Sequence, residues 1–180
     1  MLKIIALVVA VLLVGIVALA ALKPDSFRVK RAITIKAAPE TIFPLIDDLH
    51  RWTAWSPYEK KDPAMKRIFS GAASGRGAAY AWDGNNNVGE GRMEITESSP
   101  LTRIAIKLDF IRPFEGHNIA TFTLTPNEDG TEVIWAMDGP TPFISKLMQV
   151  FFNMDKMIGT DFEAGLADLK NIAEKQTQIR

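Results

Sequence analysis

The 180-residue chain contains no cysteine and carries no net charge, because 21 lysine and arginine residues balance 21 aspartate and glutamate residues. The missing cysteine excludes disulfides, zinc sites built on thiolates and thiol nucleophiles. The balanced charge argues against nucleic acid as a partner, since phosphate binding usually requires an excess of cationic groups. We therefore expect no nucleic-acid partner.

Histidine is also scarce, and neither His50 nor His117 lies in a catalytic or metal-binding pattern. His50 follows two aspartates, which fits a polar turn better than a metal or acid–base site. Strand alternation places His117 on an outward face. No serine lies in a G-x-S-x-G nucleophile elbow. We therefore predict no cofactor and no metal, and the sequence favours a non-catalytic protein.

One long hydrophobic run stands apart from this mixed composition. Residues 2–22 are almost entirely Leu, Ile, Val and Ala, with Lys3 and Gly15 as exceptions. A helix of about 20 apolar residues crosses a hydrocarbon core of about 30 Å. A signal peptide cleaved near Ala18–Ala20 and a buried soluble helix are the alternatives. The length of the run favours a retained transmembrane anchor over residues 1–23.

The anchor predicts how the rest of the chain is organised. Residues 24–180 suffice for one domain that buries roughly two thirds of its unfolded surface. More cationic residues flank the C-terminal end of the run than its N-terminal end. This asymmetry favours the cytoplasmic side for the domain. We expect a single-pass protein of the cell membrane, attached through residues 2–22.

The domain begins with a pattern typical of one strand followed by two short helices. Residues 26–36 alternate between apolar and polar side chains, with Arg31 as a charged exception on the apolar parity. Ala38-Pro39-Glu40 is a typical helix start, because proline suits the first turn. A second short helix or a turn is expected at 48–55, ended by Ser56-Pro57.

Six further strands are predicted, each ended by turn residues such as Gly, Asn and Pro. Their connections are too short for crossover helices, so neighbouring strands must be antiparallel. The expected strands are 65–70, 77–82, 88–97, 101–110, 116–125 and 131–137.

A single long helix is expected over residues 142–175, where apolar residues recur at three- and four-residue steps. The stripe comprises Leu147, Phe151, Met154, Ile158, Phe162, Leu166 and Leu169. Phe151 lies near its centre and should help to close the core. The predicted fold class is therefore α+β, a curved antiparallel sheet around one long C-terminal helix.

Several segments of the domain resemble a known family. They are ITIKAAPETIFPLIDDLHRWTAWSP, GRGAAYAWDG, VGEGRMEITESSP, TEVIWAMDGP and MDKMIGTDFEAGLADLK. Over about residues 26–175 the chain is similar to the polyketide cyclase/dehydrase-type branch of the START-related (SRPBCC) superfamily. The resemblance implies the helix-grip fold, β-αα-β6-α, with a hydrophobic ligand held between sheet and helix. Members of this superfamily include cyclases, hydrolases and lipid transporters, so the fold does not assign a reaction.

Aromatic side chains are the main candidates for lining such a cavity, because indole and phenol groups combine apolar area with one polar group. Asn118 is the lone amide on its strand face and would be the chief polar contact. Plain core packing also fits each aromatic residue, and a structural hydrogen bond also fits the amide. The candidate ligand-binding residues are Trp52, Trp55, Tyr80, Trp82, Asn118, Trp135, Met137 and Phe151.

The sequence thus favours a membrane-tethered domain that binds a hydrophobic small molecule or lipid in a cavity between the sheet and the C-terminal helix. Two alternatives stay open. A polyketide cyclase- or dehydratase-like enzyme would need paired polar groups inside the cavity. An interaction domain for another membrane protein would have its interior filled by its own side chains.

Overall fold

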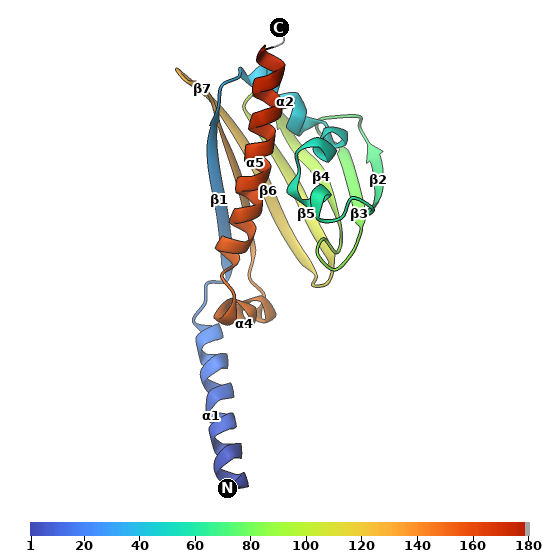
Figure 1. Ribbon diagram of the computed structural model, residues 1–180. Helices are drawn as coiled ribbons and strands as arrows, with labels where there is room; N and C mark the ends of the chain where they lie inside the picture. The colour runs from blue at the N-terminus through green and yellow to red at the C-terminus, as the bar shows by residue number, and fades with distance from the viewer. Residues whose placement is uncertain (179–180) are drawn as a thin grey trace.

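A seven-stranded sheet forms the frame of the structure, a computed structural model that describes residues 1–178 (Figure 1). Its strands lie in the order β1-β7-β6-β5-β4-β3-β2, and every neighbouring pair is antiparallel, as expected. The strands are β1 (Ser26–Ile35), β2 (Lys66–Gly71), β3 (Ala78–Asp83), β4 (Glu90–Ser99), β5 (Arg103–Arg112), β6 (Gly116–Asn127) and β7 (Gly130–Pro140).

Six helices complete the structure of residues 1–178. They are α1 (Leu2–Ala21), α2 (Pro39–Asp47), the 3₁₀ helix η1 (Leu49–Ala54), α3 (Pro57–Lys61), α4 (Phe143–Phe151) and α5 (Met154–Gln178). Figure 1 shows α5 lying along β1, with α2 and the two short helices beside it. The α+β class and the curved sheet around a C-terminal helix are confirmed, with α3 as an additional element.

The apolar helix α1 projects away from the domain (Figure 1). It is 20 residues long, an 18-residue stretch within it has a mean hydropathy of 3.2, and Ala20, in its last turn, is its one buried residue. A helix of this length extends about 30 Å, the thickness of a hydrocarbon core. α1 is therefore long and apolar enough to span a membrane, and a signal sequence has the same properties.

Arg31, the charged exception on β1, fastens the sheet to α5. Its Nη2 donates to Asp155 Oδ2 at 3.0 Å, and its Nε donates to Glu163 Oε1 at 2.6 Å. Hydrogen bonds to these two carboxylates raise the pKa of Arg31. Gly159 makes room for the guanidinium, because a Cβ at this position would collide with it. The charged residue that interrupts the strand pattern thus forms ion pairs between the sheet and α5.

The expectation of one continuous helix over residues 142–175 is wrong, because the chain breaks between α4 and α5. Phe152 is extended, with φ −122° and ψ 139°. The Asn153 side chain then accepts a hydrogen bond from the backbone N–H of Lys156 at 2.9 Å, which begins a new helix. Apolar residues of α5 still pack in the core, but Phe151 is 65% exposed on α4.

The break predicts opposite outcomes for two phenylalanines of the same apolar stripe. Phe162→Ala should lower the free energy of unfolding by about 3–5 kcal/mol, because its ring is buried in the core. Phe151→Ala removes the same ring from an exposed surface and should change this free energy by less than about 0.5 kcal/mol. Chemical denaturation of the full chain in detergent, followed by tryptophan emission, measures both values. Equal losses for the two variants would contradict the position of the break.

Candidate functional site

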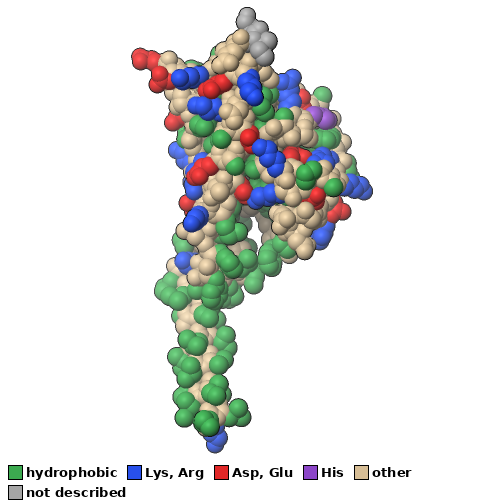
Figure 2. All heavy atoms as spheres, viewed as in Figure 1, with side chains coloured by type: hydrophobic (Ala, Val, Ile, Leu, Met, Phe, Trp, Pro, Cys, Tyr) green, Lys and Arg blue, Asp and Glu red, His purple; other side chains and the backbone are tan. Residues whose placement is uncertain are grey.

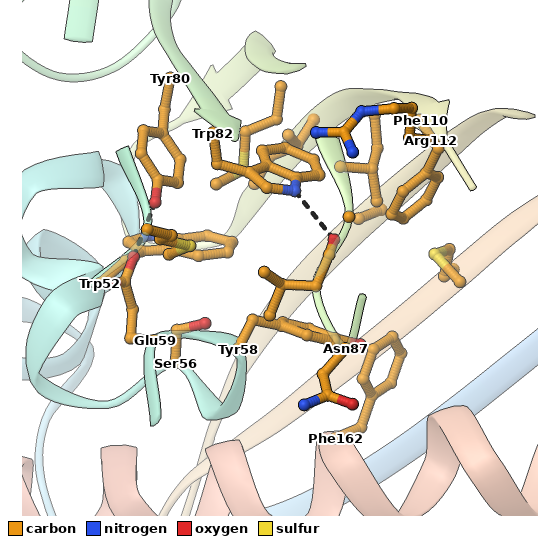
Figure 3. A pocket seen from close by; sticks show the side chains of 18 of the residues that line it. Trp52, Ser56, Tyr58, Glu59, Tyr80, Trp82, Asn87, Phe110, Arg112 and Phe162 are labelled. Carbon is orange, nitrogen blue, oxygen red and sulfur yellow. Dashed lines mark hydrogen bonds between the residues drawn. The ribbon is translucent and has the colours of Figure 1, made fainter. Parts of the chain in front are cut away.

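A cavity of about 320 Å³ lies between the sheet, the helices after β1 and α5 (Figure 3). Its wall is mostly apolar, and its size falls within the range of small-molecule binding sites. Strands β4, β5 and β6 supply much of this apolar wall through Met93, Ile106, Leu108, Phe110 and Ala120. The interior is therefore not filled by the protein's own side chains.

Five of the eight residues predicted to bind ligand line this cavity, namely Trp52, Tyr80, Trp82, Trp135 and Met137. Figure 3 shows Trp82 on one side of the central space and Phe162 of α5 on the other. The indole N–H of Trp82 donates to the backbone carbonyl of Val88 at 3.1 Å. Gly91, its partner on β4, leaves room for this ring, because a Cβ there would collide with the indole. Strand alternation thus predicted which face of the sheet the aromatic residues of the strands occupy.

Trp52 and Trp55 hold the C-terminal end of α2. Trp52 Nε1 donates to the carbonyl oxygen of Ile46 at 2.8 Å, and Trp55 Nε1 donates to that of Leu45 at 2.9 Å. The last carbonyls of a helix lack intrahelical partners, so the two indoles satisfy groups that would otherwise be unpaired. Trp52 reaches the cavity wall, whereas Trp55 is fully buried in the core and does not line it.

Trp135 is the centre of an aromatic cluster beside the cavity. Its ring stacks on Phe162 with centroids 4.0 Å apart and on Phe122 at 4.9 Å. Trp52 and Trp55 meet it edge-on at 6.3 Å and 5.7 Å. Its indole N–H is buried and has no hydrogen-bond partner among residues 1–178. An unpaired buried donor costs about 1–3 kcal/mol, and this N–H is enclosed by the protein without a partner among these residues.

Asn118 and Phe151 do not line the cavity. Asn118 is buried on β6, as its parity predicted, but its amide packs closely over Gly139 of β7, where a Cβ would collide with Oδ1. Strand parity gives the face of a residue and not its position along the sheet, so the expected polar contact is displaced from the cavity. Phe151 is exposed on α4, which ends at this residue, and so it lies outside the core.

A buried carboxylate on the cavity wall was missed by the sequence reasoning. Glu59 of α3 is 7% exposed; its Oε1 accepts from the Tyr80 hydroxyl at 2.8 Å and its Oε2 accepts from Arg67 Nε at 2.8 Å. Burial, followed by the hydrogen bond to Glu59, raises the pKa of Tyr80. The hydrogen bond to Glu59 also raises the pKa of Arg67. This network joins α3 to strands β2 and β3.

Glu59 was missed because the helix α3 that carries it was not predicted. Ser56-Pro57 was interpreted as the end of a helix, but Pro57 is the first residue of α3. The signal was present, because Ser56 and Glu59 have the S-x-x-E spacing of a helix start and proline favours the first helical position. Ser56, Tyr58 and Glu59 all contribute to the cavity wall from this segment.

Comparisons with known proteins agree with this architecture. The family model described as "Polyketide cyclase / dehydrase and lipid transport" matches residues 26–174. The protein of unknown function SA2116 from Staphylococcus aureus has a TM-score of 0.62 at 12% identity, covering 86% of this chain and 97% of that chain. The di-domain ARO/CYC StfQ from the steffimycin biosynthetic pathway has a TM-score of 0.62 at 10% identity, covering 85% of this chain and 52% of that chain.

A third structure, the Aha1 dimer from Colwellia psychrerythraea, has a TM-score of 0.56 at 18% identity and covers 82% of this chain and 96% of that chain. At these identities the likeness shows a shared fold, which confirms the expected helix-grip architecture. No curated protein matches the chain.

The chain's two tyrosines, Tyr58 and Tyr80, should resist ionisation in the folded protein. Burial raises the pKa of both above the usual value of about 10. At pH values between the usual tyrosine pKa and the raised pKa, the folded state binds more protons than the unfolded state. The stability that the two protonated tyrosines contribute is therefore fully present below about pH 10 and is lost as the pH rises through the raised pKa. Ultraviolet absorbance should show tyrosinate near pH 10 in denaturant but not in the folded chain. A tyrosinate signal near pH 10 without unfolding would refute the buried positions.

Proposed function

This chain belongs to the polyketide cyclase/dehydrase and lipid transport family, and we propose that it binds a hydrophobic small molecule or lipid while α1 tethers it to a membrane. The observation that carries the proposal is the apolar cavity of about 320 Å³, with Trp135 among the residues that line it. Burying the surface of an apolar ligand there is favoured by about 25 cal/mol per Å² removed from water.

The wall indicates a ligand that is apolar apart from a hydrogen-bond acceptor. The indole N–H groups of Trp52 and Trp82 already donate to backbone carbonyls, and the hydroxyl of Tyr80 donates to Glu59. Trp135 is different, because its buried N–H has no partner within residues 1–178. A carbonyl, ether or hydroxyl oxygen of the ligand would pair with this donor once the indole edge turns toward the cavity, and it would remove the cost of leaving the N–H unpaired.

Binding is favoured over a cyclase-type reaction by the state of Glu59. A general acid or base must reach the reacting group within hydrogen-bond distance. Both carboxylate oxygens of Glu59 are already held, one by Tyr80 and the other by Arg67. This carboxylate therefore acts as a structural link between α3 and the sheet.

The tether keeps the cavity next to the lipid bilayer, where apolar molecules concentrate. The proposal divides the chain into a single-pass anchor at 1–23 and a ligand-binding domain at 24–180. Lys23 and the cationic residues that follow it favour the cytoplasmic side of the cell membrane for the domain.

The full-length protein should remain in the membrane fraction after alkaline or high-salt extraction, because about 20 apolar residues would have to leave the bilayer. Fractionation followed by N-terminal sequencing measures both the location and the first residue. Recovery of a mature chain that begins near Ala21 in the soluble fraction would replace the anchor with a cleaved signal.

Trp135→Phe should weaken binding of a ligand that carries an acceptor and leave binding of a pure hydrocarbon unchanged, because it keeps the ring stack and removes the donor. Suitable probes are the carbonyl-bearing dye prodan and the hydrocarbon diphenylhexatriene, with the full chain in lipid nanodiscs and empty nanodiscs as the blank. Energy transfer from tryptophan to the probe measures binding. Loss of one hydrogen bond predicts a weakening of about 0.5–1.5 kcal/mol for prodan.

Trp55→Phe is the matched control for this experiment. It also removes one indole N–H, but from a residue off the cavity wall whose N–H is bonded to Leu45. It should lower stability by about 1–3 kcal/mol, because a helix-end carbonyl loses its partner, and leave the affinity for both probes unchanged. If neither probe binds the wild-type chain above the blank, the proposed function is wrong.

A further inference from the structure

The exposed apolar side chains of α4 form a continuous surface at the end of the domain where α1 joins it. Ile144, Met148 and Phe151 recur at four- and three-residue steps and are 51%, 37% and 65% exposed. Figure 2 shows hydrophobic side chains running from α1 onto this end of the domain, while charged side chains gather toward the opposite end. We define the α4 patch as Phe143, Ile144, Met148 and Phe151, all of them exposed.

The connection from α1 to β1 fixes the orientation of α4. The backbone carbonyl of Asp25 accepts a hydrogen bond from the N–H of Thr141, at 2.7 Å. The carboxylate of Asp25 pairs with Lys146 Nζ at 2.5 Å. α4 also packs against the end of α1, where Ala20 is fully buried. The polar side of α4 is therefore tied to the segment that leaves α1, and the apolar patch faces outward.

The length of that segment limits how far the domain can lie from α1. Only Leu22–Asp25 separates the last residue of α1 from the first residue of β1. Four residues reach at most about 14 Å even when fully extended. If α1 spans a bilayer of about 30 Å, its last turn lies at the bilayer surface, and so does α4.

We infer that the α4 patch is a docking surface for lipid, inserted into the interface of the bilayer that α1 spans. A helix with one apolar face and one polar face lies in the interface plane, with its apolar face about 5–10 Å below the headgroup level. The inference rests on the proposed tether and adds a second contact with the same membrane. It also explains why large apolar residues remain exposed next to the anchor, where water would disfavour them.

The mouth of the cavity opens on the same end of the domain. Pro113 and Phe114, in the turn between β5 and β6, both line the cavity, and Phe114 is 51% exposed. Ile111 beside them is 55% exposed. Figure 1 shows this turn and the β3–β4 turn pointing toward the end that carries α4. With α4 docked, the mouth faces the bilayer, so an apolar ligand exchanges with lipid over a short path.

The absence of cysteine allows a single spin label to be placed at any position of the full chain. Phe151→Cys places the label on the α4 patch, Leu13→Cys places it in the middle of α1, and Phe114→Cys places it at the cavity mouth. Ile68→Cys is the control, because Ile68 is 53% exposed but lies on β2, away from α4. The proteins are reconstituted in phosphatidylcholine vesicles, and the label's accessibility to oxygen and to a water-soluble nickel chelate is compared.

The label at position 151 should favour oxygen over the nickel chelate and report a depth of about 5–10 Å below the headgroups. The label at position 13 should lie deeper, the label at 114 should lie at the headgroup level, and the label at 68 should remain in water. A water-exposed position 151 together with an immersed position 13 overturns the docking surface and leaves the tether standing. Water exposure at both positions overturns both. A water-exposed position 114 overturns the proposed direction of the mouth, and an immersed position 68 overturns docking through α4.

Discussion

The domain depends on two indole N–H groups that hold the end of one short helix. Trp52 and Trp55 donate to the last carbonyls of α2, which would otherwise be buried without partners. The same two rings meet Trp135 edge-on and so form part of the aromatic cluster beside the cavity. Both tryptophans therefore connect the end of a helix with the centre of the core, and Trp52 also connects these two with the cavity wall.

The sheet could be predicted from the sequence because its signals are local. Two-residue alternation and turn residues locate each strand to within a few residues, and short connections fix its antiparallel partner. The helix break at Phe152 and Asn153 could not be predicted from the apolar stripe, which continues through it. An apolar face turned toward the sheet and an apolar face turned outward look identical in a sequence, since hydrophobicity gives no direction.

The residues of the cavity wall also divide into those that local sequence patterns predict and those that they do not. Tyr80, Trp82 and Trp135 were predictable, because strand parity determines which face a side chain occupies. Asn118 has the predicted parity but lies off the wall, since its distance along the sheet depends on the pairing of strands far apart in the chain. Glu59 has no signal of its own beyond a helix start. Its position on the wall follows from partners on β2 and β3 that only the folded chain brings to it.

The pairing of β1 with β7 imposes an order on the events of synthesis. Ser26 pairs with Pro140 and Ile35 with Thr131, so the first strand of the sheet has its one partner in the last. α1 needs no such partner, because the hydrogen bonds of a helix lie within it. A chain made from its N-terminus therefore completes its apolar helix long before the domain can close, and non-local pairing of this kind is slow. Until β7 is made, β1 has an unpaired edge, and the cavity wall lacks Trp135 and Met137.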